Sequence, residues 1–166
     1  MIINNSREGA TTPQQPNPTE MDLFEMLASV LVTMGRGEHI LQCMRETLAT
    51  DPLFTPMSLF KYLTKGCHYL TREQVLQFLE ENSMLGDEGE TEEIIGKIFT
   101  RYHMGWSPCY TDFLNFIYPY NSSILREIAN NRMKIYPDLD RHQKNLRPAD
   151  SVITGFLLLI QEEITV

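Results

Sequence analysis

Residues 58–79 read SLFKYLTKGCHYLTREQVLQFL, and residues 94–117 read IIGKIFTRYHMGWSPCYTDFLNFI. In each stretch, apolar residues at helical spacing stand before and after a polar segment of about a dozen residues. Each stretch therefore predicts a helix, a loop and a second helix. No long alternating pattern indicates a strand anywhere in the chain, so the predicted fold class is all-α.

Local signals place the ends of several of these helices. Thr55 and Pro56 open the first one, because proline is tolerated in the first turn of a helix. Thr71 and Gln74 have the spacing of a capping box, which predicts that a new helix starts after Thr71. Pro52 ends the helical pattern that precedes Thr55.

The first loop lacks the side chains that a calcium site needs. A helix–loop–helix site binds Ca²⁺ through six to eight oxygen ligands at alternating loop positions. With Leu63 as the first position and Gln74 as the twelfth, the ligand positions hold Leu63, Lys65, Cys67 and Gln74. A leucine and a lysine in place of carboxylates argue against a divalent cation. Leu70 occupies the eighth position, where a backbone bridge to a neighbouring loop is expected.

The second loop has an ambiguous register. Counting without gaps makes Arg101 its first position, whereas a helix that continues through Tyr102 makes the loop shorter. In both registers Pro108 or Cys109 falls near the bridging position. Asp112 is the only well-placed carboxylate and hence the only candidate calcium ligand, and one carboxylate does not hold calcium at micromolar concentration.

Two cysteines and two histidines in the loops form an alternative metal set. They are Cys67, His68, His103 and Cys109. Two cysteines with two histidines can bind Zn²⁺ if the loops lie side by side. The adjacent Cys-His pair is not a usual zinc spacing, so the simpler interpretation is that these are ordinary loop residues and that the protein has no cofactor.

With these motifs in view, the chain resembles a degenerate member of the EF-hand (calmodulin-like) superfamily. It is also similar to the EF-hand proteins of ciliated protists in LATDPLFTPMSLFKYL (48–63), YTDFLNFIYPYNSSILREIANNR (110–132) and SVITGFLLLIQEEI (151–164). The resemblance covers residues 22–166. It implies an EF-hand pair with flanking N-terminal and C-terminal helices, and a regulatory or scaffolding role on cytoskeletal or axonemal assemblies.

Four segments are expected along the chain. Residues 1–18 are polar, contain three prolines and predict a flexible tail. Residues 19–52 form an N-terminal helical segment, either two packed helices or one kinked rod, because Gly35 and Gly37 interrupt its apolar pattern. Residues 53–119 hold the degenerate EF-hand pair. Residues 120–166 form C-terminal helices that pack on the pair.

Composition narrows the classes of partner. The net charge of −8 disfavours binding to nucleic acid or to an anionic membrane surface. The longest apolar run is too short to span a bilayer, and no secretory signal is visible, so no membrane insertion is expected. Three irregularly spaced cysteines indicate reduced thiols. These features predict a cytoplasmic protein, and the resemblance adds the cilium or cytoskeleton.

No catalytic pattern is present, because none of the four histidines stands in a known nucleophile motif. We therefore expect a non-enzymatic, calcium-independent module that binds another protein constitutively. The predicted binding surface is a groove lined by Leu59, Phe60, Phe78, Phe99, Phe113 and Phe116, with Trp106 near its rim. The alternatives are a calcium- or zinc-responsive regulatory protein and an accessory subunit of a large complex.

Overall fold

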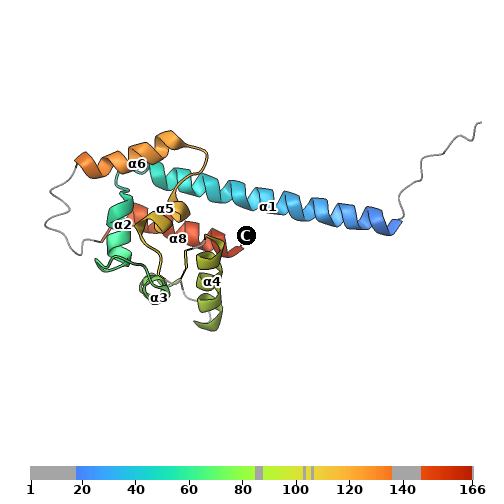
Figure 1. Cartoon of the computed structure of the whole chain (residues 1–166), viewed down its shortest axis with the longest axis horizontal. Helices are drawn as coiled ribbons and strands as arrows, with labels where there is room; N and C mark the ends of the chain where they lie inside the picture. Colours follow the sequence, from blue (N-terminus) through green and yellow to red (C-terminus); the bar gives the residue numbers. More distant parts are fainter. Residues whose placement is uncertain (1–17, 85–87, 103, 106, 136–146, 166) are drawn as a thin grey trace, which may run out of the picture. The chain divides into compact units, whose positions relative to one another are not determined.

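The computed structural model describes residues 18–84, 88–102, 104–105, 107–135 and 147–165. The predicted tail, apart from Pro18, lies outside the described residues, as do His103 and Trp106. The described residues are mostly helical and contain no strand, which confirms the all-α class. The helices are α1 (Pro18–Thr50), α2 (Pro56–Leu63), α3 (Arg72–Glu81), α4 (Glu88–Arg101), α5 (Tyr110–Ile117), α6 (Ser123–Ile135) and α8 (Asp150–Thr165) (Figure 1).

The chain divides into two compact units, Met1–Gly35 and Arg36–Val166. The division falls within α1, which is one helix from Pro18 to Thr50 and passes through both Gly35 and Gly37. The boundary between the two units, after Gly35, lies inside the predicted N-terminal segment 19–52. Residues 36–50 belong to the same unit as α2 to α8, because side chains such as Leu41 and Leu48 are buried in its core.

The helix starts follow the local signals in the sequence. Pro56 occupies the first turn of α2, after Thr55 at the N-cap. At α3, the Thr71 hydroxyl accepts a hydrogen bond from the Gln74 backbone N–H at 3.3 Å. The Gln74 side-chain oxygen accepts one from the Thr71 N–H at 2.9 Å. The predicted capping box is confirmed, and it satisfies two N–H groups that a helix start leaves unpaired.

The loop between α2 and α3 lies beside the loop between α4 and α5. The Leu70 N–H donates to the Pro108 carbonyl oxygen at 2.9 Å, and Tyr69 and Cys109 form an isolated antiparallel backbone bridge. Leu70 is the residue that the sequence placed at the bridging position. Proline has no N–H to donate, so Pro108 takes part only as an acceptor.

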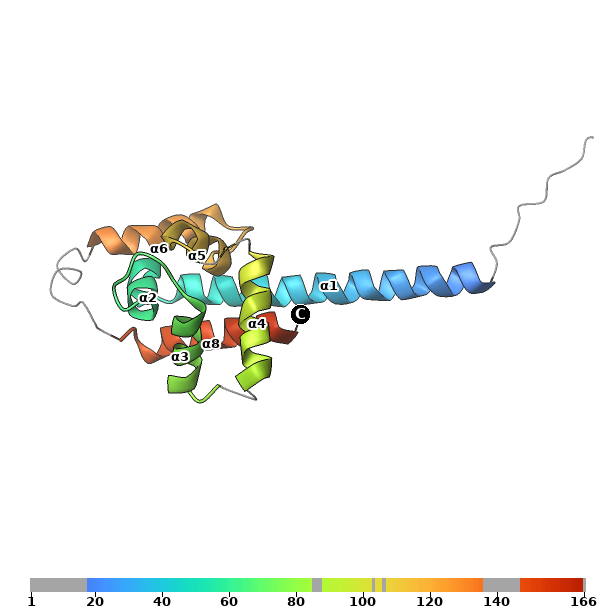
Figure 2. The same ribbon diagram turned by 60° about the horizontal axis from the view of Figure 1, so that its bottom comes forward.

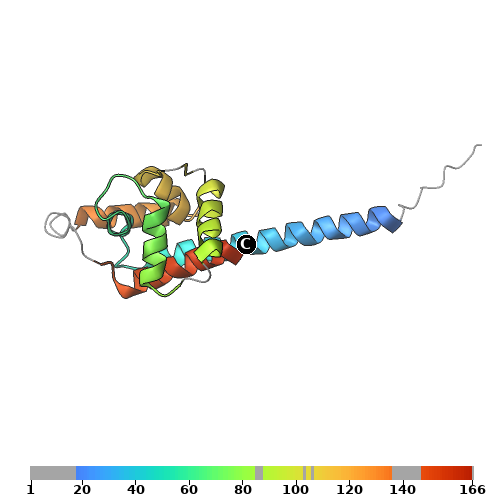
Figure 3. The ribbon, with the colours of Figure 1, turned by 90° about the horizontal axis from the view of Figure 1, so that it is seen from below.

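Helix α8 closes the core of the second unit. It contacts α4, while α3 packs on α4 and α2 packs on α5, and it runs behind α3 and α4 in Figure 2 and beneath them in Figure 3. The Phe156 ring of α8 lies 5.6 Å from the Phe78 ring and 6.0 Å from those of Phe113 and Phe116, measured between centroids. Such tilted and edge-on contacts are favourable aromatic geometries.

Candidate functional site

The predicted binding groove is not open in the structure. Its six described lining residues are at most 4% exposed and belong to the hydrophobic core: Leu59, Phe60, Phe78, Phe99, Phe113 and Phe116. Within the described residues the chain itself covers three of these side chains, because Phe156 of α8 packs against Phe78, Phe113 and Phe116. Trp106 lies outside the described residues.

In the first loop, protein groups make the contacts that hold it closed. The Gln74 side-chain N–H donates to the Thr64 carbonyl oxygen at 3.1 Å, which ties the two ends of the loop together. The chain turns at Lys65 and Gly66, whose φ angles are 52° and 81°. Glycine adopts this left-handed region without steric cost, whereas lysine does so rarely. Lys65 also places an ammonium group in the loop, and an ammonium group repels cations.

In the second loop, Asp112 serves as a helix cap. One of its carboxylate oxygens accepts a hydrogen bond from the Cys109 backbone N–H at 2.9 Å, at the start of α5. The capping bond and the negative charge both stabilise a helix N-terminus. The only calcium-ligand candidate therefore already has a local partner for one oxygen. Met104 inserts into the core from this loop and is 4% exposed.

The zinc candidates are only partly placed. Cys67 and His68 are exposed, and Cys109 is half-buried beside the bridge between the loops. His103 lies outside the described residues. Across the part of the chain that the structure describes, no group of three or more His, Cys, Asp or Glu side chains is placed to hold a metal ion.

A buried ionic cluster joins α1, α4 and α8 inside the second unit. Arg45 of α1 is fully buried, and its guanidinium donates to a Glu163 carboxylate oxygen of α8 at 2.7 Å. The Arg45 Nε donates to the Phe116 carbonyl oxygen at 2.9 Å. The Tyr102 hydroxyl bonds to both Arg45 and Glu163, and Arg101 lies 3.3 Å from the second Glu163 oxygen.

Burial and charge have opposite effects on the pKa of the Glu163 carboxyl in this cluster. Desolvation raises the pKa of Glu163, while the hydrogen bond from Tyr102 and the charges of Arg45 and Arg101 lower it. Burial also raises the pKa of Tyr102, as does its bond to Glu163. Removing one partner would leave the other charge in the interior, so the cluster has the form of a structural tie.

The sequence carried a signal for this cluster that the sequence analysis missed. Arg45 follows Leu41 by four residues and precedes Leu48 by three, which puts it on a buried face of its helix. Glu163 follows Leu159 by four residues and Ile160 by three, in the same way. Two opposite charges, each in register with an apolar stripe, indicate a buried pair.

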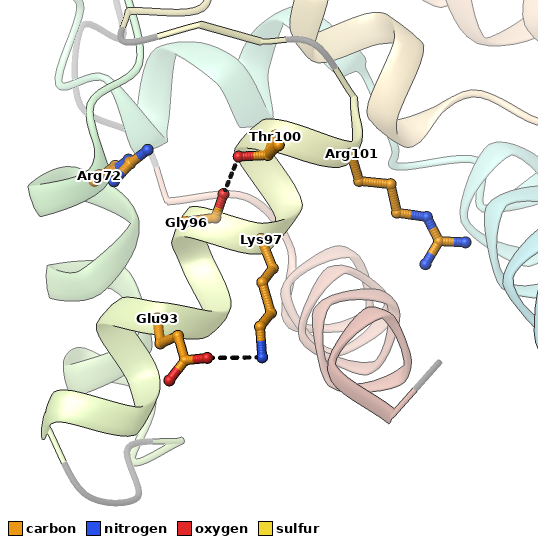
Figure 4. A pocket seen from close by; sticks show the side chains of 6 residues that line it. All are labelled: Arg72, Glu93, Gly96, Lys97, Thr100 and Arg101. Atoms are coloured by element: carbon orange, nitrogen blue, oxygen red, sulfur yellow. Dashed lines mark hydrogen bonds and ion pairs between the residues drawn. The ribbon is translucent and has the colours of Figure 1, made fainter.

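A shallow pocket of about 500 Å³ lies against α4 (Figure 4). Its lining residues are Arg72, Glu93, Gly96, Lys97, Thr100 and Arg101. Lys97 pairs with Glu93 at 2.9 Å, and Arg101 pairs with Glu38 and Glu163. Figure 4 shows Arg72, Lys97 and Arg101 pointing in different directions, so the pocket does not gather positive charge around one point.

The strongest surface feature is the exposed apolar segment, defined as residues 23–34 of α1, in the first unit. Its large apolar side chains are each between 53% and 68% exposed: Leu23, Phe24, Met26, Leu27, Val30, Leu31, Val32 and Met34. All but Val32 fall on one broad face at helical spacing. Contiguous exposed apolar surface of this kind marks an interaction site on a folded protein.

Comparisons with known proteins do not assign the chain to a family. No protein-family model, curated protein or solved structure matches it. A search of the described helices for one long and apolar enough to cross a membrane found none.

Proposed function

We propose that this chain is a non-enzymatic protein-binding module that works without calcium and belongs to a larger assembly. The observation that carries the proposal is the exposed apolar segment, where eight large apolar side chains are each more than half exposed. Exposed apolar area is costly in water, and association with another protein removes that cost.

We further propose that α2–α3 and α4–α5 are a degenerate EF-hand pair. Three observations support this: two helix–loop–helix units, adjacent loops, and a backbone bridge at Leu70 and Pro108. The loop contacts of Gln74 and Asp112 support calcium independence, since an oxygen of each side chain already accepts a hydrogen bond from a capping backbone N–H, and the Gln74 amide N–H closes the loop by donating to Thr64. A cytoskeletal or axonemal assembly in the cytoplasm or cilium is the setting that the EF-hand resemblance favours.

A photo-crosslinking experiment tests the proposal. We would place p-benzoylphenylalanine at Leu27, on the apolar face, or at Ser29, on the opposite side of the helix, in the cells that make the protein. Irradiation should give a discrete protein adduct from position 27 and little from position 29. The adduct should form equally with calcium present and with calcium chelated.

Two results would contradict the proposal. An absence of protein adducts from position 27 would show that the segment meets no protein in the cell. An adduct that forms only with calcium would make the chain a calcium-responsive regulator instead. Purified chain analysed by native mass spectrometry checks the metal question independently, and the expected mass is that of the metal-free chain.

A further inference from the structure

We draw no further inference here: the strongest candidate, the apolar face that residues 23–34 of α1 expose, carries none because nothing in the structure shows what covers it.

Discussion

The exposed apolar segment and α8 are both rich in apolar residues, but the segment's apolar side chains are exposed and those of α8 are mostly buried. Leu27 and Leu31 in the segment are 54% and 59% exposed, whereas Phe156, Leu159 and Ile160 in α8 are at most 2% exposed. Both stretches carry apolar residues at helical spacing. What distinguishes α8 is a set of specific partners: three phenylalanine rings and a buried arginine that pairs with Glu163.

This difference shows that an apolar helical pattern can belong either to a buried helix or to an exposed one. Periodicity identifies side chains that gain stability on leaving water, but it does not identify which surface covers them. In α8 the covering surface lies within the same unit. In the exposed apolar segment the described residues provide none, and we infer that another chain does. The following predictions separate the two cases by stability and by ionisation.

The largest expected contrast is between alanine substitutions in the two helices. Phe156→Ala should lower the free energy of unfolding by about 4 kcal/mol, because it removes a fully buried ring and leaves a cavity. Leu27→Ala, made in dilute protein to avoid association, should change it by less than about 0.5 kcal/mol. Urea denaturation followed by circular dichroism measures both, and equal losses would remove the distinction between the helices.

The next contrast concerns the ionic tie to α8. Arg45→Ala should lower the free energy of unfolding by about 3 kcal/mol, because it leaves the Glu163 carboxylate buried without its main partner. The exposed Arg36 in the same helix provides the control, and Arg36→Ala should cost less than about 0.5 kcal/mol.

A double substitution isolates the interaction within that tie. Arg45→Met combined with Glu163→Met should recover much of the stability that either single change loses, because no charge then stays buried alone. Chemical denaturation of all four chains gives the coupling energy directly. Strict additivity of the two losses would show that Arg45 and Glu163 do not act as a pair.

A smaller effect is expected from the side chain that closes the first loop. Gln74→Ala removes the capping partner of Thr71 and the bond to the Thr64 carbonyl oxygen. It should lower the free energy of unfolding by about 1 kcal/mol. Glu80→Ala, on the exposed side of the same helix, is the control. Adding calcium should change the melting temperature of neither variant, and a calcium-dependent rise in the wild-type chain would contradict ion-free closure.

At high pH the ionisation of Tyr110 should lower the free energy of unfolding by about 1 kcal/mol or less, after allowance for solvent screening. Burial raises the pKa of this phenol to about 12 in the folded state, against about 10 when unfolded. The unfolded chain therefore releases this proton first, and stability falls as the pH rises from about 10 to about 12. Tyr110→Phe should reduce this fall, as measured by denaturation across that range.

Most helices could be predicted from sequence because local chemistry specifies their ends. Thr71 with Gln74 and Pro56 are short-range signals, and the structure has each where the sequence placed it. The contact of Leu70 with the other loop is long-range, and it is predicted by numbering the loop positions of a helix–loop–helix site. The binding groove could not be predicted in this way. Whether Phe78 and Phe113 are exposed depends on α8, which is far away in the sequence and leaves no local mark on them.

Amide hydrogen exchange tests the central claim most directly. In the dilute purified chain, residues 23–34 should exchange quickly while α8 exchanges slowly, since exposed helices without tertiary contacts open easily. In the assembly isolated from cells, both should exchange slowly, and only residues 23–34 should have changed. Slow exchange of these residues in the dilute chain, or unchanged fast exchange in the assembly, would contradict the account.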